Sequence, residues 1–103
     1  MAKLAWTEPA LSQLDEIASI IALDKPEAAR MVVARVFEAT DRVEQFVKLG
    51  RRVPEFPRTN YRQVWINPCW VYYRIDGERI YVLHVRRAEK LFRPEDLSFA
   101  DEQ

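Results

Sequence analysis

The segment Trp70–Arg87 constrains the fold more than any other part of the chain. Two runs rich in Val, Ile, Tyr and Trp flank the dipeptide Asp76-Gly77. Because glycine tolerates the positive φ angle that a tight turn needs, this arrangement predicts a β-hairpin. A two-residue Asp76-Gly77 turn would place Arg74 opposite Arg79, a like-charge pair that a three-residue loop would avoid. Both registers therefore remain open.

Charge is unevenly distributed in a chain whose net charge is zero. Residues 1–49 carry six basic and eight acidic side chains, residues 50–93 carry ten and four, and residues 94–103 carry none and four. A basic middle beside an acidic end suits an anionic partner, or a tail that folds back on a basic sheet. A sheet face that is merely solvated by arginine fits the composition equally well.

The first half of the chain has the pattern of one strand and two amphipathic helices. Lys3–Trp6 alternates like a short strand, and Thr7 suits the N-cap of a helix that continues to residue 21. Asp24 and Glu27 have the spacing of a capping box, which predicts that a second helix begins there. The helical period continues to residue 47, and Gly50 is expected to end this helix as its C′ residue.

The second half predicts a loop followed by three strands. The segment 51–60 holds two prolines and is expected to be a loop, whereas 61–66, 70–75 and 79–85 alternate like strands. The exit segment from residue 86 is expected to include a short helix from Pro94. The order β-α-α-β-β-β predicts an α+β fold, with a helical hairpin packed on a mainly antiparallel four-stranded sheet. A single domain of residues 1–103 is expected, with a short acidic tail over about 94–103.

Residues that support enzymatic chemistry are scarce. Only two glycines are present, so no phosphate-binding glycine loop is expected. The single histidine, His84, lies inside an expected strand, where a packed side chain is favoured over a catalytic one. The single cysteine, Cys69, is expected to be a small buried residue. No metal or other cofactor is expected, and the lack of a long apolar run favours a cytoplasmic protein with no membrane partner.

Cationic and aromatic side chains are interleaved along the expected strands and their exit. The cations are Arg62, Arg74, Arg79, Arg86, Arg87, Lys90 and Arg93, and the aromatic residues are Tyr61, Trp65, Tyr72, Tyr73 and Tyr81. This combination suits phosphate binding with base stacking, or an acidic peptide lying along the sheet. Packing alone also enriches aromatic residues in strands.

Several short motifs, taken in order, resemble the RelE/ParE toxin superfamily of bacterial type II toxin–antitoxin systems. They are the start Trp6–Leu11, the interhelix junction Asp24–Ala29, the helix end Leu49–Arg51 and the hairpin Val71–Gly77. The resemblance covers roughly residues 3 to 92 and rests on order and spacing rather than on any single motif.

The resemblance implies one of two activities. RelE-like members cleave mRNA on the ribosome with clustered lysines and arginines and often a C-terminal tyrosine, whereas ParE-like members inhibit DNA gyrase. Arg86 matches the arginine of the RelE-like pattern, but the tyrosine position six residues later is Phe92. The expected lysine cluster is reduced to Arg62. The chain is therefore more similar to the ParE-like branch.

The ParE-like resemblance implies a toxin that inhibits DNA gyrase rather than an enzyme. Its partner would be a ParD-like antitoxin that wraps the helical hairpin and the sheet, and DNA would be bound only through the antitoxin complex. The residues expected to bind the target or the antitoxin are Arg62, Arg74, Tyr73, Arg86, Arg87 and Lys90, together with the outer faces of both helices.

Two alternatives remain open. In a RelE-like ribonuclease, Arg62, Arg86 and Arg87 would hold phosphate, and His84 or Tyr73 would move protons. In a non-toxic member of the superfamily, only antitoxin binding would be retained.

Overall fold

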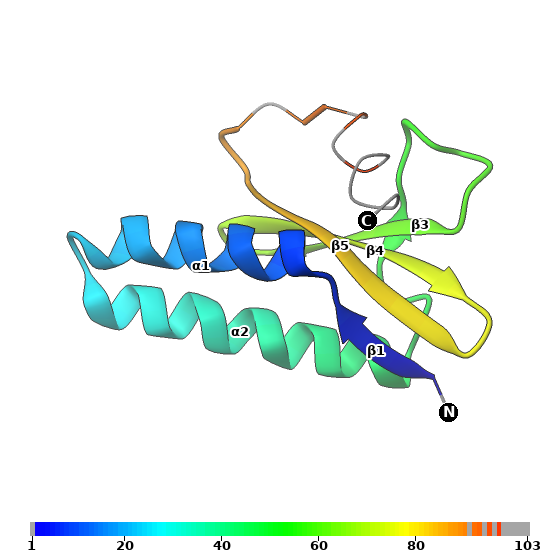
Figure 1. Cartoon of the computed structure of the whole chain (residues 1–103), viewed down its shortest axis with the longest axis horizontal. Coiled ribbons are helices and arrows are strands. Elements are labelled where there is room, and N and C mark those ends of the chain that lie inside the picture. Colours follow the sequence, from blue (N-terminus) through cyan, green and yellow to red (C-terminus); the bar gives the residue numbers. More distant parts are fainter. Residues whose placement is uncertain (1, 91, 94, 96, 98–103) are drawn as a thin grey trace.

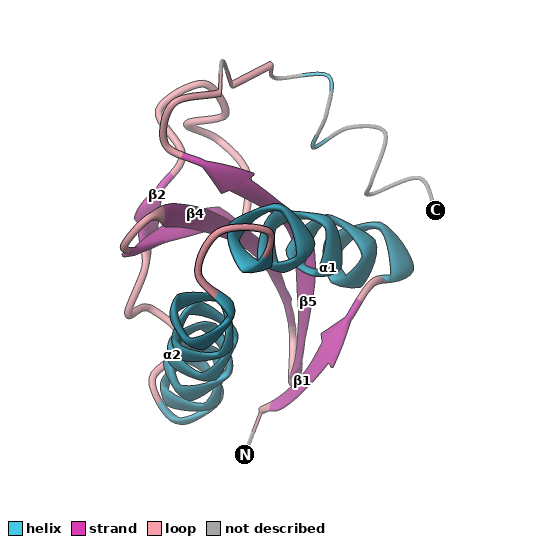
Figure 2. Ribbon diagram, turned by 90° about the vertical axis from the view of Figure 1, so that its left-hand side faces the viewer, coloured by secondary structure: helices cyan, strands magenta, loops and turns pink. Residues whose placement is uncertain are grey.

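Two helices cover one face of a five-stranded sheet in the computed structural model, which describes residues 2–90, 92, 93, 95 and 97 (Figures 1 and 2). The elements are β1 (Lys3–Trp6), α1 (Glu8–Ala22), α2 (Pro26–Gln45), β2 (Arg51–Arg52), β3 (Tyr61–Ile66), β4 (Cys69–Asp76) and β5 (Arg79–Arg87). The strand order is β1-β5-β4-β3-β2, with β1 parallel to β5 and every other pair antiparallel. The predicted α+β class is confirmed.

The sheet has one strand more than the sequence predicts. Arg51 and Arg52 form β2 and pair with Gln63 and Arg62 of β3, although this segment was expected to be a loop. Two adjacent arginines have no apolar alternation, so nothing in the local pattern signals a strand. The pairing arises from β3, which presents an unpaired edge to the residues that follow α2.

Helix α1 begins as the sequence predicts. Thr7 is the N-cap, and its hydroxyl accepts the Ala10 N–H at 3.4 Å while donating to the Val82 carbonyl at 2.7 Å. The same hydroxyl therefore caps the helix and ties it to β5. Ala10, Leu14 and Ile17 point from the helix into the core.

The predicted ends of α2 are wrong at both positions. Its N-cap is Lys25 rather than Asp24, no side chain caps it, and the Asp24 N–H donates to Ile21 in the turn that closes α1. At the other end the helix stops at Gln45, and Phe46, with φ −130° and ψ 84°, leaves the helical region. Gly50 is not a C′ residue with positive φ, because Gly77 is the only described glycine with a positive φ.

The β4–β5 hairpin has neither of the two loops considered from the sequence, the Asp76-Gly77 turn or a three-residue loop. Its two-residue turn is Gly77-Glu78, because Asp76 pairs with Arg79. Gly77 has φ +59°, as the first position of this tight turn requires. Arg74 therefore faces Tyr81 instead of Arg79, and its guanidinium lies 4.8 Å from the centroid of the tyrosine ring.

A bulge in the middle of β5 changes which side chains share a face. Tyr72 pairs with His84 and Tyr73 pairs with Val82, so Leu83 is an extra residue between them. Val82 and Val85 both pack in the core under the helices, three residues apart instead of two or four. As a consequence Arg86 lies on the face away from the helices, opposite Trp70.

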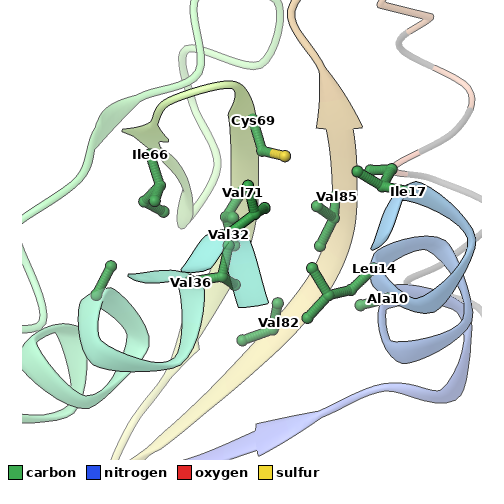
Figure 3. Close-up of a cluster of buried hydrophobic side chains, with 11 residues drawn as sticks. Ala10, Leu14, Ile17, Val32, Val36, Ile66, Cys69, Val71, Val82 and Val85 are labelled. Carbon is green, nitrogen blue, oxygen red and sulfur yellow. The ribbon is translucent and has the colours of Figure 1, made fainter. Parts of the chain in front are cut away.

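Hydrophobic side chains pack on both faces of the sheet. The main core lies between the helices and the strands, where Leu14, Val36, Val71 and Val82 point toward one another (Figure 3). On the opposite face a second cluster forms from Val53, Tyr72, Leu83 and Leu97. Glu95 and Leu97 have helical backbone, as predicted after Pro94, but the rest of the expected tail helix lies outside the described residues.

Candidate functional site

The cationic residues singled out in the sequence do not form one site. Arg62 lies on the helix-covered side of β3 because it pairs with Tyr73, whereas Arg86 lies on the opposite face beside Trp70. Arg74 shares the face of Arg86. Of the three arginines that would hold phosphate in a RelE-like centre, Arg62 and Arg86 therefore lie on opposite faces of the sheet. The third, Arg87, pairs with Cys69 in the β4–β5 ladder.

Arg86 is half-buried, and each of its three nitrogens donates a hydrogen bond within the protein. Its Nε and Nη2 donate to the Tyr72 hydroxyl at 3.2 and 3.0 Å, and its Nη1 donates to the Lys90 carbonyl at 2.8 Å. The Phe92 ring stacks on Tyr72, with centroids 4.9 Å apart and planes 10° apart. We call Arg86, Tyr72 and Phe92 the exit clamp, because they fasten the chain after β5 to the sheet.

A cavity of about 440 Å³ lies between α1 and the end of β5. It gathers four of the predicted binding or catalytic residues, which are His84, Arg86, Arg87 and Lys90. Its charge is mixed, because Glu16 and Glu89 also line it and Arg87 Nε lies 2.7 Å from Glu89 Oε1. The side wall is fixed by Gln13, whose Oε1 accepts the Val85 N–H at 2.8 Å.

Tyr73 and Arg62 fasten the chain after α2 to the sheet. The Tyr73 hydroxyl donates to the Val47 carbonyl at 2.8 Å and accepts the Gly50 N–H at 2.9 Å. Arg62 Nη1 donates to the Gly50 carbonyl at 2.8 Å. A Cβ at Gly50 would lie 2.7 Å from the Gln63 carbonyl oxygen and 2.9 Å from the Tyr73 ring. The role of this glycine is therefore close approach, not helix termination.

Neither buried tyrosine is prepared to act as a base. Burial raises the pKa of Tyr72 above its usual value of 10.0, against the lowering effect of its hydrogen bond from Arg86. Burial also raises the pKa of Tyr73, and the Gly50 N–H opposes it. Cys69 is buried and free, and burial raises the pKa of its thiol. Its assignment as a small buried residue is confirmed.

The outer side of the helical hairpin carries a shallow groove of about 520 Å³. Small side chains from both helices line most of it: Ala18, Ser19, Ala22, Ala29 and Ala34. Small residues let another backbone approach closely, so the groove fits an added helix. The sequence prediction named these outer faces but not the residues, because small residues at helical spacing have no signal of their own.

Three comparisons with known proteins bear on this geometry. The family model described as ParE toxin of type II toxin-antitoxin system, parDE, matches residues 4–92. The chain belongs to this ParE toxin family. The superfamily resemblance read from the sequence is confirmed, including its ParE-like branch.

Individual relatives agree with the family assignment. A structure titled as the chromosomal ParDE TA system from P. aeruginosa superposes with a TM-score of 0.71 at 26% identity, over 86% of this chain and 98% of that one. Y4kP of Sinorhizobium fredii (strain NBRC 101917 / NGR234), named as a candidate toxin, is 43% identical over 49 residues. That match spans 48% of this chain and 51% of Y4kP, so the chain aligns with about half the length of this curated relative.

Two further observations concern the described part of this ParE-family chain. Within residues 2–90 and the four described residues beyond them, no three His, Cys, Asp or Glu side chains gather as metal ligands would. None of the helices in that part of the chain is long and apolar enough to cross a membrane.

Proposed function

We propose that this chain is the toxin of a type II toxin–antitoxin pair, that it inhibits DNA gyrase by binding, and that a ParD-like antitoxin neutralises it. The ParE family match over residues 4–92 supports the toxin assignment. The observation that carries the choice of binding over catalysis is the exit clamp. Arg86, which would stabilise phosphate in a ribonuclease, instead donates hydrogen bonds to the Tyr72 hydroxyl and to backbone carbonyls.

His84, Arg86 and Arg87 share one cavity, but other groups that RNA cleavage would use are poorly suited to it. In-line cleavage needs cations on the developing charge and a group that moves a proton. Arg62 lies on the other side of the sheet from Arg86, and the pKa values of Tyr72 and Tyr73 are raised. Phe92 has no hydroxyl and is stacked on Tyr72. These features support the gyrase-binding function over the RelE-like alternative.

A pair of assays on the purified chain tests the proposed target. Gyrase supercoiling and DNA-cleavage reactions are run beside a ribosome-programmed mRNA cleavage reaction. We expect gyrase to be inhibited and the mRNA to stay intact. In the cell, we expect the chain to act in the cytoplasm. Cleaved mRNA with normal gyrase would overturn the proposal in favour of a ribonuclease, and an absence of both effects would favour a non-toxic antitoxin binder.

The antitoxin is proposed to place a helix in the hairpin groove. Ser19→Arg puts a long charged side chain among small ones, so we expect the affinity for the antitoxin to fall by at least about tenfold, while gyrase inhibition is retained. Ser12→Arg, two turns away on the same exposed side of α1, is the matched control. Equal antitoxin affinities for the two variants, measured by calorimetry, would move the antitoxin away from this groove.

A further inference from the structure

Three cationic side chains surround a cavity of about 330 Å³ next to the β2–β3 pair. They are Lys48, which follows α2, Arg52 of β2 and Arg62 of β3. The remaining lining residues are Thr59, Asn60, Ile75 and Gly77, so none of the described residues around this cavity carries a negative charge. We call this place the basic cavity.

The two arginines are neighbours because of the strand register. Arg52 and Arg62 are directly opposite each other in the antiparallel β2–β3 pair. Like charges directly opposite each other destabilise a sheet. Opposed arginines beside a third cation therefore leave positive charge that no described protein group lining the cavity neutralises.

The arginines are also held in place by the backbone. Arg62 Nη1 donates to the Gly50 carbonyl at 2.8 Å, and Arg52 Nη1 donates to the Thr59 carbonyl at 3.1 Å. A guanidinium has five N–H donors, so each arginine keeps several for another partner. Neutral carbonyl anchors fix the orientation of both groups without cancelling their charge, which is the arrangement that suits a bound oxyanion.

We propose that the basic cavity is a binding site for a phosphate group. Paired guanidinium groups match the oxygen geometry of phosphate, and a lysine ammonium adds a point charge. Three cations suit a phosphate better than a singly charged carboxylate. The cavity volume of about 330 Å³ is roughly ten times the ~30 Å³ that one water molecule occupies in the liquid. The cavity therefore has room for a phosphate and for the group that carries it. The phosphate belongs to a free nucleotide or to a nucleic-acid backbone.

The basic cavity shares no residue with the groove on the helical hairpin or with the exit clamp. It does share Arg62 with the contact that fastens the chain after α2, and Arg62 is also among the residues expected to bind the target or the antitoxin. Phosphate binding goes beyond the proposed function, and the double substitution that tests it leaves Arg62 intact, so its result does not depend on whether the chain inhibits gyrase.

An NMR titration of the purified chain with inorganic phosphate at constant ionic strength tests the proposal. We expect saturable shifts of the Asn60 and Gly77 amide signals. The double substitution Lys48→Ala with Arg52→Ala should weaken binding by about tenfold or more, because two charged hydrogen-bond donors are lost. Arg62 is left intact, since its link to Gly50 contributes to the fold. Arg35→Ala, on an exposed part of α2, removes one positive charge elsewhere and should leave the affinity unchanged.

Two more ligands distinguish the source of the phosphate. Tighter binding of a nucleoside 5′-monophosphate than of a short oligothymidylate would identify a free nucleotide, and the reverse would identify a nucleic-acid backbone. Either result supports the site if the double variant loses it. Shifts that do not saturate, that persist in the double variant, or that acetate produces equally well would overturn the proposal.

Discussion

Gly50 shows how one residue without a side chain determines where two segments meet. Its N–H and carbonyl bind Tyr73 and Arg62, and the backbone of β3 passes so close that a methyl group has no room. Gly77 is needed for a different reason, because its φ is +59° while the space around it is open. Gly50 is therefore needed for close packing, and Gly77 is needed for its backbone conformation.

We expect Gly50→Ala to lower the free energy of unfolding by about 1–3 kcal/mol, because the added Cβ forces the Gln63 backbone or the Tyr73 ring to move. Gly77→Ala should cost about 1–2 kcal/mol through backbone strain alone. Urea unfolding measures both values. Gly77→Asn should restore most of the second loss, since asparagine tolerates positive φ, whereas Gly50→Asn should be at least as harmful as Gly50→Ala. A fully stable Gly50→Asn variant would contradict the close approach.

The raised pKa of Tyr73 predicts a loss of stability at high pH. A group whose pKa is higher in the folded state than in the unfolded state contributes stability below its unfolded pKa, here 10.0, and loses that contribution as the pH rises through the folded value. We therefore expect the free energy of unfolding to fall above about pH 10. Tyr73→Phe should remove part of this dependence, and at pH 7 it should cost about 1–3 kcal/mol because the Gly50 N–H loses its acceptor.

The control for this measurement is Tyr81→Phe, on the half-buried side chain of a neighbouring strand. Lysines also titrate above pH 10, so only the difference between the two tyrosine variants reports on Tyr73. Identical slopes of stability against pH for both variants would exclude the mechanism.

At the scale of elements, periodic segments were predictable and contacts between segments were not. The apolar stripes of α1 and α2 and the alternation in β3, β4 and β5 are local, so the sequence displays them. The pairing of β2 depends on β3, a separate segment of the chain. The Lys25 N-cap depends on the turn that closes α1, where the Asp24 and Lys25 N–H groups donate to Ile21. The bulge at Leu83 changes the face of everything after it, which is why Arg62 and Arg86 looked like partners in the sequence but lie on opposite faces.

The exit clamp is the contact that holds the end of β5, and it requires an arginine. Arg86→Lys keeps the charge but cannot reach the Tyr72 hydroxyl and the Lys90 carbonyl at the same time. We expect the segment after Arg87 to become cleavable by protease at least about tenfold faster, because one or more charged hydrogen bonds are lost. Arg79→Lys, on an exposed part of the same strand, is the control, and equal cleavage rates would show that the clamp does not hold the exit.

In the whole molecule, side chains pack on both faces of the sheet, although helices cover only one face. The segment around Val53 and Leu97 covers part of the second face, where Leu97 is completely buried with Tyr72 and Leu83. Trp65, which lies on the same face opposite Trp70, is 46% exposed. A tail folded back on the basic sheet was one of the arrangements that the charge distribution suits. The described part of that end contributes an apolar contact through Leu97, and most of the tail lies outside the described part of the chain.

Leu97→Ala should therefore lower the free energy of unfolding by about 2–5 kcal/mol, as expected for a leucine truncated in a core. Leu23→Ala, at an 88% exposed position in the interhelix turn, should change it by less than about 0.5 kcal/mol. Chemical denaturation of both variants gives the comparison. A small effect at Leu97 would mean that the second cluster contributes little to stability.

The engagement of Arg86 has a consequence for any attempt to build a ribonuclease centre on this chain. Arg86 holds its own backbone in place, and Phe92→Tyr would add a hydroxyl beside Tyr72 without removing the hydrogen bonds of that guanidinium. Arg62 would still lie on the other face of the sheet. A single substitution at Phe92 would therefore not bring Arg62 and Arg86 together around the new hydroxyl.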